Sequence, residues 1–250
     1  QRDRSNETPN DPLQEYDYDS EYWGVGIRGE ALFGEGQDGI GIQNLQYFGE
    51  FILETGHSIG DDGDPATVSN SSDDIESWAF DVGLIYYPEH RTKPRVLLEF
   101  AYASGDEDRF SPQNTLFGNT PGTDDDGFLG FGFINTGVSF APLLANLEFV
   151  RVAGAFRPFE ECCEWRVSNM EVGSSFFAYW RPEDNAGISD IRADTPGTHF
   201  LGTEVDFFMN WRISSDLYLL LNYGVFFPEA DSFTVERSRQ FVGLTLTWLF

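Results

Sequence analysis

Hydrophobic residues recur at every second position through most of the chain. In LGTEVDFFMNWRI (201–213), one set of alternate positions holds bulky apolar residues, and the other holds glycine, polar and charged residues. The same alternation runs through 217–227 and through the last segment, FVGLTLTWLF (241–250). A period of two is that of an extended strand, whose successive side chains point to opposite faces. The pattern therefore predicts β-strands in this part of the chain.

Six more segments alternate in the same way, so the sequence predicts nine strands of about ten residues each. No amphipathic helix of comparable length competes with them. The predicted fold class is therefore all-β. The six further strands are 22–33, 45–56, 78–87, 94–104, 146–156 and 170–180.

Three features favour a transmembrane antiparallel β-barrel over a soluble sandwich. The apolar faces carry large aromatic residues near the strand ends, as an aromatic girdle at the membrane interfaces requires. The opposite faces combine glycines with charges of both signs, which suits a water-filled lumen. Strands of about ten residues exceed the usual length in soluble sheets and match a tilted span of a bilayer. The predicted girdle residues are Trp23, Trp78, Tyr102, Trp180, Trp211 and Trp248.

Charge changes this picture at the connections. The 250 residues carry a formal charge of −27, and Lys93 is the only lysine, which argues against a surface for nucleic acid. The acidic residues gather in stretches that also contain turn-forming residues, so these stretches are predicted loops. The segment nearest to a transmembrane helix, 128–145, is interrupted by polar residues and Pro142. The acidic loops are 60–76, 104–113, 123–127 and 181–194.

Barrel connections alternate between short periplasmic turns and long outer loops. Counted back from a periplasmic C-terminus, this rule makes 104–145 one long outer connection, which we expect to fold into or over the lumen. If 128–145 were instead an extra strand, the acidic loops would fall on the periplasmic side. Residues 22–250 then form the barrel, and 1–21 form an acidic segment outside its wall. Because single-chain bacterial barrels have even strand numbers, nine strands indicate a missed strand or a part of a larger barrel.

Three stretches carry motifs of a known family. HFLGTEVD (199–206), YGVFFPE (223–229) and AYASGDED (101–108) resemble motifs of alginate-export-type outer-membrane porins, with departures at Phe200 and Glu229. The resemblance implies a barrel of about 18 strands, of which this chain resembles the C-terminal half. An N-terminal portion, another polypeptide or a second copy would supply the remaining strands. The matching positions are Ser104, Gly105, Asp106, Gly202, Glu204, Asp206, Phe226, Phe227 and Pro228.

Charged residues on the predicted inner faces are the candidates for lining a pore. In a narrow lumen they would set ion selectivity and the local field. The alternative is that they form cross-strand salt bridges that fill the lumen and lock the strand register. The candidates are Arg28, Glu30, Arg95, Glu99, Arg151, Arg157, Glu204, Asp206 and Arg212.

Two further sets of residues have candidate roles. The outer stripe of the last segment resembles the signal that the outer-membrane assembly machinery recognises; it comprises Val242, Leu244, Leu246, Trp248 and Phe250. Carboxylates of the acidic loops are weak candidates for a Ca²⁺ site, although none has the full D-x-[DN]-x-[DN]-G spacing. These candidates are Asp61, Asp62, Asp64, Asp124, Asp125 and Asp126. The adjacent Cys162 and Cys163 cannot join distant elements.

The function expected from these patterns is that of a Gram-negative outer-membrane porin or export channel. It would pass small polar or anionic solutes passively, with polysaccharide as a further candidate, and would contact lipid and lipopolysaccharide. One alternative is a structural or partner-holding barrel subunit with a plugged lumen. A barrel hydrolase using His199 near the acids of 183–194 is another, although no serine motif accompanies this histidine. Apart from Ca²⁺, no cofactor is expected.

Overall fold

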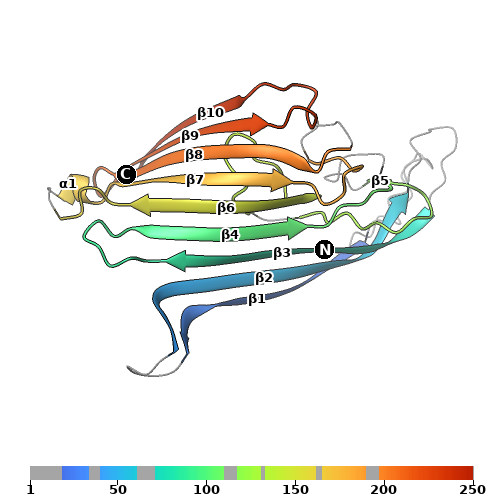
Figure 1. The fold of residues 1–250 in the computed structure, drawn as a ribbon, viewed down its shortest axis with the longest axis horizontal. Coiled ribbons are helices and arrows are strands. Elements are labelled where there is room, and N and C mark those ends of the chain that lie inside the picture. Colours follow the sequence, from blue (N-terminus) through green and yellow to red (C-terminus); the bar gives the residue numbers. More distant parts are fainter. Residues whose placement is uncertain are drawn as a thin grey trace.

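One antiparallel β-sheet makes up most of the computed structural model (Figure 1). The model describes residues 19–33, 40–60, 71–109, 117–130, 133–161, 165–189 and 197–249. The sheet order is β1-β2-β3-β4-β6-β7-β8-β9-β10, with β5 paired to β2 outside this path. The strands are β1 (Asp19–Phe33), β2 (Ile40–Gly60), β3 (Ser71–Tyr86), β4 (Arg95–Ala103), β5 (Phe117–Asn119), β6 (Leu147–Phe156), β7 (Glu171–Trp180), β8 (Phe200–Arg212), β9 (Leu217–Pro228) and β10 (Arg239–Trp248). One helical turn, α1 (Trp165–Ser168), lies between β6 and β7.

All nine predicted strands are present, which confirms the all-β fold class. Within the described ranges, no helix is long and apolar enough to cross a membrane. The sheet does not close on itself, because β1 and β10 each pair with a single neighbour in the described part of the chain. The fold is therefore that of a stretch of barrel wall.

The hairpin of β2 and β3 is much longer than the sequence pattern indicated. These strands span 21 and 16 residues, and β3 begins at Ser71, inside the stretch predicted as an acidic loop. Asp73 and Ile75 are buried, whereas Asp74 and Glu76 are exposed, so the alternation continues. The prediction of a loop from 71 to 76 was wrong because Ile75 is the one apolar residue in this part of the strand, so hydrophobic alternation does not mark it.

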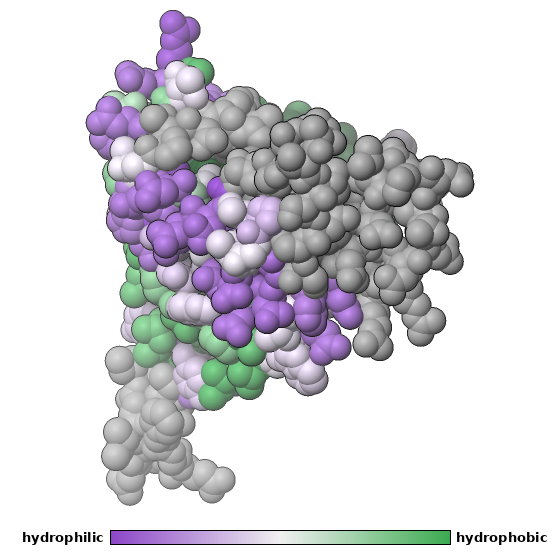
Figure 2. Space-filling view, turned by 90° about the vertical axis from the view of Figure 1, so that its right-hand side faces the viewer, coloured by the Kyte–Doolittle hydropathy of each residue, from purple (hydrophilic) through white to green (hydrophobic). Residues whose placement is uncertain are grey.

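The lengths of the connections differ between the two ends of the sheet. The connections between β2 and β3, β4 and β6, β7 and β8, and β9 and β10 lie at one end, the right end in Figure 1. The four at the other end include the turn at 213–216. In the view onto the long-connection end, hydrophilic residues gather on the described surface, and hydrophobic ones lie lower in the view (Figure 2). This arrangement matches the predicted alternation of long loops and short turns, except at the link between β6 and β7 (157–170), which is longer than the connections between β2 and β3 and between β9 and β10.

The two faces of the sheet have opposite character. One face, called the outer face here, exposes apolar side chains at both edges, including Val25 at 68% exposure on β1 and Leu244 at 69% on β10. On the other face, called the inner face, alternate residues such as Phe149, Phe177 and Glu204 are fully buried. The long connections cover this inner face. The sheet therefore presents apolar side chains on one side and a packed, partly polar surface on the other.

The connection between β4 and β6 covers much of the inner face. In its described part the only strand is the three-residue β5, and none forms within the described residues of 128–145. Of the two sequence alternatives, the structure therefore shows a connection rather than an extra strand. Its Phe140 packs with Ile188 and Phe233 from two other connections, over Phe177 and Phe226 of the sheet. A hydrophobic core thus forms between the inner face and its connections.

Candidate pore-lining face

The predicted charged residues of β1, β4, β6 and β8 lie on the inner face. Strand register places several of them in one row, which consists of five charged residues, three phenylalanines and one glycine. Arg157 lies just beyond β6, where its Nη1 is 3.3 Å from Glu160 Oε2. The row crosses all nine strands of the main path in the order Arg28, Phe48, Gly83, Glu99, Arg151, Phe177, Glu204, Phe226 and Arg239.

A cross-strand ion pair occupies the middle of this row. Arg151 Nη1 lies 3.1 Å from Glu99 Oε2, and Arg151 Nη2 lies 3.4 Å from Ser175 Oγ on β7. The guanidinium also stands 5.3 Å from the centre of the Phe177 ring. The side chains of Arg151 and Glu99 are mostly buried, so each charge depends on the other for compensation. This pair corresponds to the predicted salt-bridge ladder, and it ties β4, β6 and β7 in register.

A second ion pair lies nearer the short-turn end. Arg95 Nη2 is 2.8 Å from Glu171 Oε1, and both side chains are partly exposed. Lys93 and Arg157 both contact Glu160 in the neighbouring connections, and the hydrogen bond from Lys93 lowers the pKa of Glu160. Exposed pairs of this kind contribute little to stability. Their charges are therefore more available to solutes than those of the buried pair.

Glu204 has a different environment from the one predicted. It is fully buried, and its carboxylate accepts backbone N–H groups from the connection between β4 and β6. Oε1 accepts those of Val138 and Ser139, and Oε2 accepts that of Phe140, each at 2.7 Å. Glu204 therefore does not face an open lumen in this structure; it holds a covering segment.

Glu54 on β2 plays a similar part at the other side of the inner face. Its exposure is 1%, and its Oε2 accepts the N–H of Leu129 at 3.0 Å and the Ser77 hydroxyl at 3.0 Å. The Tyr22 hydroxyl contacts both Glu54 Oε1, at 2.7 Å, and the Leu129 carbonyl, at 2.8 Å. Sequence reasoning missed Glu54, although a carboxylate at an inner position of an alternating strand was a usable signal.

Arg239 is another inner residue that sequence reasoning missed. Its guanidinium carbon lies 5.2 to 5.8 Å from the ring centres of Phe140, Phe226 and Phe233. Phe140 and Phe226 stack with their centres 4.2 Å apart and an interplanar angle of 11°. A cation over aromatic rings is attracted by their negative faces. The contact joins β10 to the covering connection.

The motif residues behind the family resemblance converge on this connection. Gly202 has φ +135°, where the register between β7 and β8 shifts, and this irregularity accompanies full burial of Leu201. Ser104 Oγ donates to the Asp126 carbonyl at 2.7 Å. Glu204 and Phe226 contact its residues 138–140, as described above. One residue of each motif, namely Ser104, Glu204 or Phe226, therefore contacts the covering segment.

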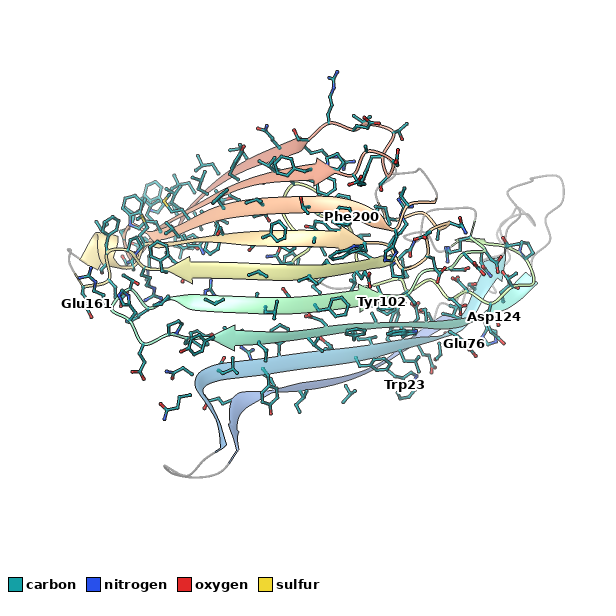
Figure 3. The ribbon with its side chains drawn as sticks, in the orientation of Figure 1. Trp23, Glu76, Tyr102, Asp124, Glu161 and Phe200 are labelled. Atoms are coloured by element: carbon teal, nitrogen blue, oxygen red, sulfur yellow. The ribbon has the colours of Figure 1, made fainter. Side chains whose placement is uncertain are left out.

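The predicted girdle residues lie on the outer face near the two ends of the strands. Trp78 stacks on Tyr102 with ring centres 4.6 Å apart, and Trp180 packs against Phe200. Figure 3 shows Trp23, Tyr102 and Phe200 near the end that carries the long connections, opposite Glu161. Trp211 and Trp248 lie toward the short-turn end. Their partners on β9 are Leu219 and Leu217, which are at the start of that strand.

The other predicted sets are partly described. Val242, Leu244, Leu246 and Trp248 lie on the outer face of β10 with exposures of 62 to 72%, and Phe250 lies outside the described residues. Asp61, Asp62, Asp64, Cys162 and Cys163 also lie outside them.

Asp125 has a partner that competes with a metal ion. Its carboxylate contacts Arg109, whereas Asp124 and Asp126 are exposed. The remaining, partial burial of Asp126 raises its pKa, and nearby carboxylates add to this effect. In the described ranges, no three His, Cys, Asp or Glu residues are grouped closely enough to hold an ion.

Antiparallel strands with an apolar outer face and a charged inner face are the features of one part of the wall of a transmembrane β-barrel. The model of the alginate export family matches residues 14–238, so the chain belongs to this family. This result confirms the resemblance, and it places the chain in a family of export proteins of the outer membrane. No curated protein matched the chain.

Proposed function

We propose that this chain forms part of the wall of an outer-membrane channel through which small polar or anionic solutes pass passively. The observation that supports the proposal is the set of inner-face charges that stay at least partly exposed, among them Arg28 on β1 and the pair of Arg95 and Glu171, opposite an apolar outer face. Charges that line a narrow passage attract or repel ions and thereby select among them. The C-terminus of β10 lies at the short-turn end, which we assign to the periplasm, with the long acidic connections outside the cell.

The proposal includes partners and further strands. The outer face would contact lipid and lipopolysaccharide, and the stripe on β10 would bind the outer-membrane assembly machinery. The open edges of β1 and β10 would pair with strands from elsewhere in a longer polypeptide, from another chain or from a second copy. Sizing of the purified complex and sequencing of every polypeptide in it would separate these sources. A closed barrel built from one copy of residues 1–250 alone would contradict this part.

Single-channel recording in planar bilayers tests the transport function. We expect a stable conductance whose ion selectivity shifts toward cations in Arg95→Gln, because this change removes a partly exposed inner positive charge. The matched control is Gln240→Asn, a neutral change on the outer face of β10 at the lipid side. A silent bilayer would contradict the channel.

The second candidate is a structural or partner-holding barrel, and one observation favours it. Phe140, Ile188 and Phe233, from three connections, pack in one cluster over the inner face, which narrows that end of any lumen. A plugged barrel would give no conductance in the wild type and in Arg95→Gln alike. The same recordings therefore distinguish the two candidates.

A further inference from the structure

The covering connection is attached to the sheet at two buried carboxylates that lie far apart. Glu54 holds Leu129 from β2, and Glu204 holds residues 138–140 from β8. The two carboxylates lie on strands β2 and β8, and the strands β3, β4, β6 and β7 lie between them in the sheet. The connection therefore crosses the inner face rather than standing beyond the ends of the strands.

The attachment at Glu204 uses every oxygen of a fully buried carboxylate. Three successive backbone N–H groups converge on it, each at 2.7 Å. Such convergence needs an unusual backbone, and Gly137 provides it with φ +95°. A Cβ added to Gly137 would lie 2.6 Å from both Glu204 Oε1 and the Tyr179 hydroxyl, so the turn sits directly on these side chains. Hydrogen bonds to a charged acceptor are among the strongest in proteins.

Other contacts fix the same segment from both sides. The Tyr179 hydroxyl donates to the Thr136 carbonyl at 2.9 Å, and the Thr136 hydroxyl donates to the Pro142 carbonyl at 2.7 Å. Ser139 Oγ donates to the Arg239 carbonyl at 2.9 Å, which joins the segment to β10. Near Glu54, Phe128 packs with Ala79 and Ala103 in a second hydrophobic cluster.

We propose that Glu54 and Glu204 are positioning residues that hold residues 128–130 and 133–142 across the inner face as a fixed constriction, which limits the size of the solutes that pass. This inference rests on the proposed channel function. Detaching the segment would leave a buried carboxylate without its N–H partners, which is costly in a site that water does not reach. The constriction therefore stays in place while solutes pass.

Hydrogen exchange of the backbone amides tests the attachment without any transport assay. In the membrane-inserted wild type, the amides of Val138, Ser139 and Phe140 should be strongly protected. In Glu204→Ala, their exchange should be at least about a hundredfold faster, because three charge-assisted hydrogen bonds are lost. The control is Glu50→Ala, which removes an exposed inner-face carboxylate of β2. Continued protection in Glu204→Ala would overturn the positioning role.

Deletion of the covering segment tests the constriction, so that the conclusion does not depend on a single substitution. Gly130 lies beside Leu144, since a Cβ on Gly130 would be 2.9 Å from the Leu144 carbonyl oxygen. Residues 131–142 can therefore be removed and the chain rejoined from Gly130 to Leu143 through a short glycine linker. Glu204→Gln is introduced with the deletion, so that no unpaired carboxylate remains. This variant should fold because the sheet pairings are unchanged.

Uptake of neutral sugars of increasing size by proteoliposomes gives the readout. We expect the wild type to pass monosaccharides and to exclude oligosaccharides, and the deletion variant to take up a trisaccharide at least about tenfold faster. A merely structural role for the segment would lower stability without moving the size limit. Equal size limits in both proteins would overturn the constriction. If neither protein passes any sugar, the channel function fails, whereas the exchange experiment still decides the role of Glu204.

Discussion

Arg109 Nη1 lies 2.6 Å from Asp125 Oδ1 and 2.8 Å from Asp125 Oδ2 in the connection between β4 and β6. Both side chains are at most 5% exposed. The backbone of Asp125 pairs with that of β3 through Asp74 and Glu76. This buried ion pair therefore anchors the outer part of the connection to the extended end of the β2–β3 hairpin.

Loss of the arginine from this pair should be strongly destabilising. Arg109→Met leaves the Asp125 carboxylate buried without its cation, and we expect the free energy of unfolding to fall by about 3–5 kcal/mol. Urea unfolding in lipid vesicles measures the change. Arg95→Met, which breaks the partly exposed pair with Glu171, should cost less than about 1 kcal/mol. Equal losses in the two variants would contradict the importance of burial.

Stability of the connection should depend on pH through Asp106. Burial raises the pKa of Asp106 from 3.8 to about 7; the N–H of Asp108 opposes this shift, and the nearby Asp125 adds to it. The folded protein thus binds this proton more tightly than the unfolded chain does. The resulting stabilisation is complete below about pH 4 and is lost as the pH rises through 7.

Unfolding measured from pH 5 to pH 8 tests this dependence. The wild type should lose stability over this range, and Asp106→Asn should lose less, because an amide does not titrate. Burial also raises the pKa of Glu183 and of Asp126, so a dependence of the same sign should remain in Asp106→Asn. An identical pH profile in the two proteins would contradict the role of Asp106.

Gly105 should not tolerate a side chain. A Cβ there would lie 2.1 Å from Asn146 Oδ1. Asn146 cannot move easily, because its Nδ2 donates to the Ala186 carbonyl at 3.1 Å and its Oδ1 accepts the Glu183 N–H at 2.9 Å. We expect Gly105→Ala to cost about 1–3 kcal/mol in unfolding free energy.

Gly154→Ala is the matched control for this substitution. The nearest atom to a Cβ on Gly154 is the Arg95 carbonyl oxygen at 3.9 Å, so the strand can accept a methyl group. Its unfolding free energy should change by less than about 0.5 kcal/mol. A larger loss in Gly154→Ala than in Gly105→Ala would show that the contact with Asn146 is not the cause.

An arginine introduced into β10 should lower the stability of the protein at one position and have little effect at the adjacent one. Leu244 points to the outer face and Thr245 to the inner face, with partners Leu221 and Leu220 on β9. Leu244→Arg should destabilise the folded protein in a bilayer by about 2–4 kcal/mol, because arginine would face hydrocarbon. Thr245→Arg should have a small effect, since a water-filled lumen solvates the charge. Similar losses in both variants would contradict the assignment of the faces.

Alternation predicted the strands well where each strand has one apolar and one polar face. Val242 and Leu244 alternate with Gly243 and Thr245, so the assignment of these residues to the two faces of β10 followed from the pattern. The same rule failed at the start of β3, where Asp73 and Asp74 occupy opposite faces. Polar residues extend this strand because β5 and the backbone of Asp125 pair with the hairpin there. Such backbone pairing does not depend on hydrophobic side chains, so a hydrophobic pattern does not predict it.

The sequence predicted which charged residues lie on the inner face, but it did not predict what their side chains contact. Arg151 and Glu99 were placed on the inner face, and they do form a cross-strand pair there. Glu204 was placed on the same face, but its carboxylate binds backbone N–H groups from a segment 64 to 66 residues away. Backbone donors are present at every residue except proline, so no sequence motif shows which of them a carboxylate will meet.

The sequence by itself determined that this protein is a sheet with one apolar and one polar face, because side-chain alternation is a local property of an extended chain. It also indicated the family, through short motifs in β8, in β9 and after β4. Tertiary structure alone decided that the connection between β4 and β6 lies across the inner face and that Glu54 and Glu204 hold it. The physical reason is that these contacts join residues distant in the chain, and burial makes them strong only after the sheet has formed.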